Sequence, residues 1–72
     1  MKFKYYIAIS NNIFKYHMEI TKIGYDELIT CAMKYDSKPI QRICKYNNRI
    51  SNITRFNIDG SKISLVYRLE VQ

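Results

Sequence analysis

The chain has 72 residues, of which 47% are hydrophobic and 25% charged, and its formal net charge is +6. A chain of this length forms one small domain with no room for a cofactor cleft beside its core, and its apolar content argues against disorder. The sequence offers neither the roughly 20 apolar residues of a membrane span nor, after the charged start Lys2-Phe3-Lys4, a secretion signal, so we expect a folded, cytoplasmic protein.

The first segments of the chain have the two-residue period of half-buried strands. In residues 2–9 the apolar side chains are spaced two apart. Ser10-Asn11-Asn12 has the composition of a turn, and the alternation resumes from Phe14 to Thr21. We predict an antiparallel hairpin. Its apolar face would hold Phe3, Tyr5, Phe14, Tyr16 and Met18.

The period changes to that of a helix after Gly24. Apolar residues at positions 25, 28, 29 and 32 predict a helix over about residues 25–35, with Asp26 and Glu27 in its first turn and Lys34 in its last. Pro39 cannot continue a helix, so the segment Asp36-Ser37-Lys38-Pro39 ends it. Residues 40–46 then predict a short strand.

The last third of the chain predicts two more strands. Asn47-Asn48 is a turn, and residues 49–58 form a strand in which Ile50 and Ile53 fall on opposite faces, so we expect a β-bulge near Ser51 or Asn52. Asp59-Gly60 is the strongest hairpin signal, because both residues tolerate a positive φ. The final strand would bury one set of alternating residues: Ile63, Leu65, Tyr67, Leu69 and Val71.

The element order ββαβββ predicts an α+β fold in which one helix packs on a four- or five-stranded antiparallel sheet, as a single domain over residues 1–72. One helix covers one face only. On the other face we expect several cations with a tyrosine and the only histidine: Lys2, Lys4, Tyr6, Lys15, His17, Arg55 and Arg68. Arg55, and with it Arg49, would lie on this side if the bulge lies as expected.

This basic, partly aromatic surface predicts binding to nucleic acid or to a nucleoprotein complex. Clustered Lys and Arg release counterions from phosphates, and rings offer stacking surfaces for bases. Alternatively, the lysines only keep the face soluble and block edge pairing. A third reading is an interface with an acidic host protein or a second copy of the chain, anchored by Tyr6, Ile13, Val66 and Arg68.

Chemistry beyond binding has little support in the sequence. Cys31 and Cys44 stand apart, without a CxxC pair or a neighbouring histidine, so we expect reduced, buried packing residues and neither a metal site nor a disulfide. A small ribonuclease would need His17 and Glu19 as general acid and base. No phosphate loop or nucleophile motif is present, so we predict no cofactor and no enzymatic activity.

Composition also suggests a source. Half of the chain is Ile, Lys, Asn, Tyr or Phe, whose codons are AT-rich. Short AT-rich reading frames are common in bacteriophages and other mobile elements. We therefore expect a phage-encoded accessory protein that acts by occupancy to block or modulate a host process such as defence.

Overall fold

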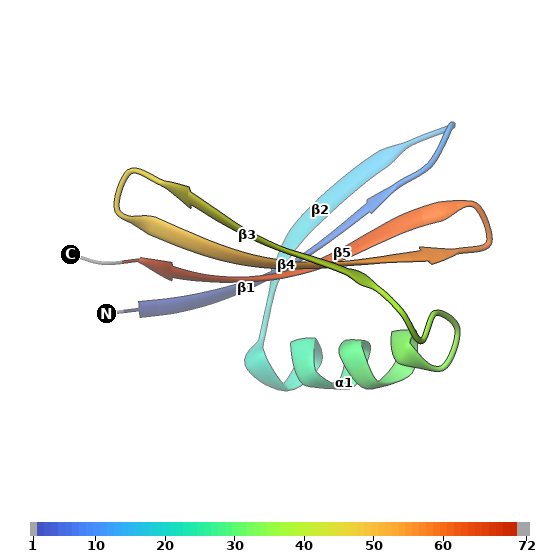
Figure 1. The fold of residues 1–72 in the computed structure, drawn as a ribbon, viewed down its shortest axis with the longest axis horizontal. Helices are drawn as coiled ribbons and strands as arrows, with labels where there is room; N and C mark the ends of the chain where they lie inside the picture. The colour runs from blue at the N-terminus through green and yellow to red at the C-terminus, as the bar shows by residue number, and fades with distance from the viewer. Residues whose placement is uncertain (1, 71–72) are drawn as a thin grey trace.

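A computed structural model describes residues 2–70 and confirms the α+β prediction (Figure 1). The elements in chain order are β1 (Lys2–Ser10), β2 (Lys15–Ile20), α1 (Lys22–Met33), β3 (Ile40–Tyr46), β4 (Arg49–Ile58) and β5 (Ser61–Glu70). The five strands form one antiparallel sheet in the spatial order β2-β1-β5-β4-β3. The predicted position of Val71 lies outside the described residues.

The helix lies on one face of a strongly twisted sheet (Figure 1). Strand β5 is central, and β2 and β3 form the two edges. Lys2 pairs with Glu70, so the first and last described residues lie side by side. Within residues 2–70, no helix is long and apolar enough to cross a membrane.

The turns follow their residue chemistry. Ile58 pairs with Ser61, so Asp59-Gly60 is a two-residue hairpin loop, and both residues have positive φ angles of 50° and 78°. This is the type I′ geometry that matches the twist of the flanking strands. The Oδ1 atom of Asn11 accepts the backbone N–H groups of Ile13 at 2.8 Å and of Phe14 at 3.0 Å, which closes the β1–β2 turn.

The helix begins earlier and ends earlier than the sequence indicates. Thr21 is the N-cap, and its Oγ1 accepts the backbone N–H of Gly24 at 3.0 Å, so α1 starts at Lys22. Asp26 and Glu27 therefore lie beyond the first turn, and the prediction that they complement the helix dipole there is wrong. Asp26 instead pairs with Lys22 at 2.8 Å on the exposed side of α1.

The predicted bulge in β4 is also wrong. β4 pairs with β3 from Arg49 to Arg55 and with β5 over its full length, without an extra residue. Ile50 therefore lies opposite Leu69 on the helix side, whereas Ile53 lies opposite Val66 on the other side. The irregular spacing of the two isoleucines reflects an apolar residue on the uncovered face and not a kink in the strand.

The core lies between α1 and the three inner strands. Its buried members are Ile7, Tyr25, Ala32, Phe56 and Leu65. The ring of Tyr25 lies 5.3 Å from that of Tyr5 and 5.8 Å from that of Tyr67, measured between centroids. The helix does not reach the edge strands, so apolar side chains that face its side of the sheet remain exposed there.

Both cysteines are free, as expected, but both are exposed, so the prediction of buried packing residues is wrong. Cys44 lies on the edge strand β3, every residue of which is exposed. Cys31 belongs to α1, whose buried residues are Tyr25 and Ala32. A single helix leaves too little buried surface for either thiol.

Candidate functional site

We call the sheet face opposite α1 the open face. Residues directly opposite each other on neighbouring strands point to the same side, so the strand register decides which residues belong to it. Val66 of β5 lies between Tyr6 of β1 and Ile53 of β4, and these three share the open face. The charged residues of the open face are Lys2, Lys4, Lys15, Glu19, Arg42, Arg49, Arg55, Lys62, Arg68 and Glu70.

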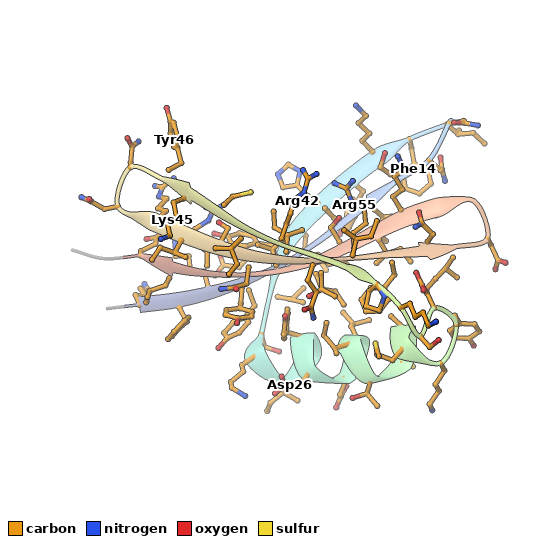
Figure 2. The ribbon with its side chains drawn as sticks, in the orientation of Figure 1. Phe14, Asp26, Arg42, Lys45, Tyr46 and Arg55 are labelled. Atoms are coloured by element: carbon orange, nitrogen blue, oxygen red, sulfur yellow. The ribbon has the colours of Figure 1, made fainter. Side chains whose placement is uncertain are left out.

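The open face carries the net charge of the whole chain. Of the 12 Lys and Arg residues and the 6 Asp and Glu residues, it holds eight cations and two glutamates, a difference equal to the formal charge of +6. The remaining four lysines are balanced by four acidic residues of α1 and the loops. Figure 2 shows Arg42 and Arg55 pointing away from the side on which α1 and Asp26 lie.

The seven binding residues that the sequence predicts all lie on the open face: Lys2, Lys4, Tyr6, Lys15, His17, Arg55 and Arg68. Arg49 joins them without the bulge. Arg42 and Lys62 were missed. Lys62 could have been found from the sequence, because it lies six residues before Arg68 on the same strand and so shares its face. The face of Arg42 depends on the pairing of β3 with β4.

Four exposed cations form what we call the cation line: Arg42, Arg55, Lys62 and Lys15. Arg42 lies opposite Ile53 of β4, and Arg55 lies two residues further along the same strand. Lys62 lies opposite Asn57, another two residues along β4, so the line runs obliquely across the strands. Lys62 and Lys15 both pair with Ser10. The residues directly opposite these four are Ser, Asn and Ile, so no carboxylate faces any of them.

The centre of the open face is aromatic and apolar. The guanidinium of Arg68 lies 4.9 Å from the centroid of the Tyr6 ring, and its Nε donates to Ser51 Oγ at 3.4 Å. A cation over an aromatic ring is attracted by the ring's negative face, so this contact fixes both side chains. Val66 and Ile53 continue the row beside Tyr6.

One end of the open face is less positive. Arg49 Nε lies 3.8 Å from Glu70 Oε1, and Glu70 also lies opposite Lys2. The carboxylate offsets part of the charge of these two cations. The positive charge available to a partner is therefore concentrated toward the cation line.

The two residues of the ribonuclease alternative, His17 and Glu19, share the open face of β2 but are both exposed on an edge strand. General acid–base catalysis requires a positioned pair, and solvent exposure on an edge supplies no such positioning.

Ile13, one of the anchors predicted for an interface with a protein partner, lies in the β1–β2 turn and is 91% exposed.

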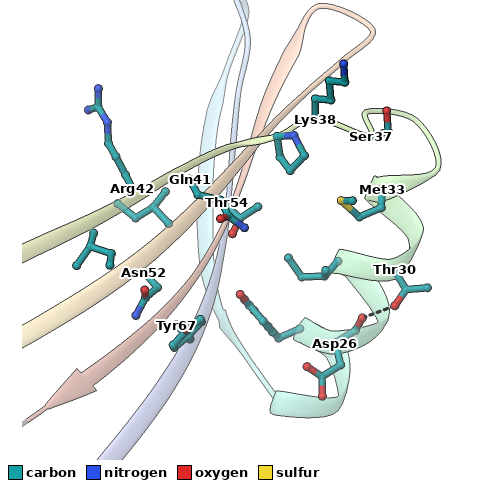
Figure 3. Close-up of a pocket in the computed structure, with 15 residues that line it drawn as sticks. Asp26, Thr30, Met33, Ser37, Lys38, Gln41, Arg42, Asn52, Thr54 and Tyr67 are labelled. Carbon is teal, nitrogen blue, oxygen red and sulfur yellow. Dashed lines mark hydrogen bonds between the residues drawn. The ribbon is translucent and has the colours of Figure 1, made fainter.

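A groove of about 950 Å³ lies between α1 and the strands β3 and β4, and the sequence analysis missed it (Figure 3). Its sheet side holds polar residues at helix-facing positions, namely Gln41, Asn52 and Thr54. Gln41 lies on the edge strand β3, and Asn52 and Thr54 lie on the neighbouring strand β4. Their amide and hydroxyl groups are suited to uncharged polar ligands.

Neither site has the residues of a metal centre. Among residues 2–70, no group of three or more His, Cys, Asp or Glu side chains lies close enough to hold a metal ion.

Comparisons of the chain with protein-family models, with curated proteins and with solved structures give no match.

Proposed function

We propose that the protein binds nucleic acid through the open face and acts by occupying it, without catalysing a reaction. The observation that carries this proposal is the concentration of the whole net charge, +6, on one face of the sheet. Lys and Arg clustered in this way gain affinity from the release of counterions condensed on phosphates.

A single strand fits the open face better than a duplex. The helix, which is the element that most often enters the major groove, lies on the opposite face. The open face instead offers the cation line for phosphates, and Tyr6 with Arg68 for unpaired bases. Tyr46, 76% exposed on β3, adds a second ring at the edge.

The salt dependence of binding tests the proposal. Fluorescence anisotropy with a labelled single-stranded oligonucleotide is measured over a series of salt concentrations. Each neutralised phosphate contributes a slope of about −0.7 to the plot of log affinity against log salt, so several contacts give a steep decline. Affinity that is absent at low salt contradicts nucleic-acid binding.

A matched pair of variants tests the face. Changing three residues of the cation line in the variant Arg42→Glu, Arg55→Glu, Lys62→Glu should abolish binding, because phosphates would then meet carboxylates. The control variant Lys34→Glu, Lys38→Glu, Lys45→Glu removes the same charge from exposed residues outside the open face and should retain most of the affinity. Equal losses in the two variants would mean that total charge, and not the open face, determines binding.

An acidic protein is the second candidate partner. The row Tyr6, Val66 and Ile53, ringed by cations, resembles an interface with an apolar centre and a charged rim. The AT-rich composition supports a phage or mobile-element origin, and with it a role in the host cytoplasm against a defence process. A pull-down from host lysate separates the two candidates, because partners held through nucleic acid are lost after nuclease treatment whereas a direct protein partner persists.

A further inference from the structure

The edge strand β2 leaves an apolar strip uncovered on the helix side of the sheet. Tyr16 and Met18 lie there and are each 46% exposed, and Phe14, immediately before β2, is 50% exposed. Within residues 2–70, no strand lies beside the outer edge of β2, although its backbone groups are ready to pair. An exposed edge beside exposed apolar side chains is a surface that a further strand would bury.

The sequence of β2 is complementary to itself. Lys15 lies two residues before His17, and Glu19 lies two residues after it. If two copies of β2 pair antiparallel with His17 opposite His17, Lys15 of each copy lies opposite Glu19 of the other, on the open-face side. On the helix side Tyr16 lies opposite Met18, and Phe14 opposite Ile20. A two-fold symmetric interface requires this reciprocity, in which each contact occurs twice.

We propose that the protein forms a symmetric homodimer through antiparallel pairing of β2 with β2 of a second copy, in the register that centres on His17. Two Lys15–Glu19 pairs and two Tyr16–Met18 contacts stabilise it, in addition to the backbone hydrogen bonds. Shifting the register by two residues in either direction removes both ion pairs. Charge complementarity therefore selects one register.

The other edge and the open face are poor places for self-association. β3 carries Arg42 and Lys45 and no carboxylate, and a charged edge strand opposes pairing with its own copy. Two open faces of net charge +6 would repel each other if they stacked. Pairing of β2 avoids this repulsion because it places the open faces side by side in one continuous sheet, with both helices on the opposite side.

Charge reversal tests the register. The dimer dissociation constant of the wild type is measured by sedimentation equilibrium and compared with those of Lys15→Glu and Glu19→Lys. Each single variant places like charges opposite each other twice and should weaken the dimer roughly tenfold or more. The double variant Lys15→Glu, Glu19→Lys restores both pairs with exchanged signs and should recover the affinity. Lys45→Glu, on the other edge, should leave it unchanged.

Cysteine crosslinking tests the centre of the pairing. Facing residues of antiparallel strands have Cα atoms about 4.5 or 5.5 Å apart, which is within the range of a disulfide. In a Cys31→Ser, Cys44→Ser background, His17→Cys should therefore form an intermolecular disulfide on mild oxidation. Ile43→Cys, at the centre of β3, should not.

Two results would overturn the proposal. One is a wild-type chain that stays monomeric at every concentration; the other is a Lys15→Glu variant that dimerises as well as the wild type. Neither measurement uses nucleic acid, so a failure here is distinguishable from a failure of the proposed function. Circular dichroism of each variant shows whether the monomer remains folded.

Discussion

Tyr25 joins the helix to the sheet, because its ring packs against Tyr5 and Tyr67 at the point where α1 crosses β1 and β5. Only 8% of the residue is exposed. Its contact with Tyr67 is edge-to-face, with an interplanar angle of 87°. Aromatic pairs in such geometry contribute about 0.5–1.5 kcal/mol beyond the area they bury.

The stability of the protein should fall at alkaline pH because of Tyr25. Burial, and next to it the neighbouring Tyr67, raises the pKa of Tyr25 above its ordinary value. The folded state then holds the phenolic proton to higher pH than the unfolded state does. The free energy of unfolding therefore keeps its full value below about pH 10 and declines as the pH rises through the raised pKa of Tyr25.

Urea unfolding at about pH 8 and about pH 11 measures this decline. Tyr25→Phe cannot ionise and should show a smaller decline than the wild type, whereas Tyr35→Phe, at a residue 74% exposed, should behave like the wild type. An unchanged decline in Tyr25→Phe would assign the effect to other tyrosines.

Leu65 is one of two large side chains that are fully buried, so its truncation should be among the most costly. It lies on the central strand β5, on the helix side of the sheet, and Leu→Ala at such a site costs about 2–5 kcal/mol through lost transfer energy and the cavity left behind. Ile13→Ala, at a residue 91% exposed, should change stability by no more than about 0.5 kcal/mol. Thermal unfolding followed by circular dichroism compares the two, and similar effects would contradict the described core.

At the scale of elements, the start of α1 depends on one side chain. The Thr21 hydroxyl satisfies the N–H of Gly24, so Thr21→Ala should cost about 1 kcal/mol of stability. Thr30 provides the control, because its hydroxyl only donates to the carbonyl of Asp26 within the helix, at 3.0 Å. Thr30→Ala should be neutral or slightly stabilising in urea unfolding, since alanine favours helices. Equal losses would mean that Thr21 is not the cap.

The sequence predicted the strands and turns well because their signals are local. The alternation around Tyr5 and Leu65 and the positive-φ residues Asp59-Gly60 each act within a few residues. The helix start was missed because the periodicity began at Tyr25 while the capping threonine lay four residues earlier. The bulge is predicted because Ile50 and Ile53 are both expected on the buried face, whereas Ile53 lies on the open face.

At the scale of the whole molecule, the charge segregation follows from the strand order, which the sequence does not display. Arg42 joins the other cations only because β3 pairs with β4 in one register. The groove beside α1 likewise arises from the extent of the sheet beyond the helix. Both features are long-range, so periodicity within one strand cannot predict them.

The most direct test of nucleic-acid binding by the open face is methyl NMR of the labelled protein during titration with a single-stranded oligonucleotide. The methyl groups report on the two faces separately. The open face holds Ala8, Ile53 and Val66, and the helix side holds Ile29, Ile63 and Leu65. We expect the first three to shift and the second three to stay. Shifts confined to the helix side, or no shifts at low salt, would contradict binding by the open face.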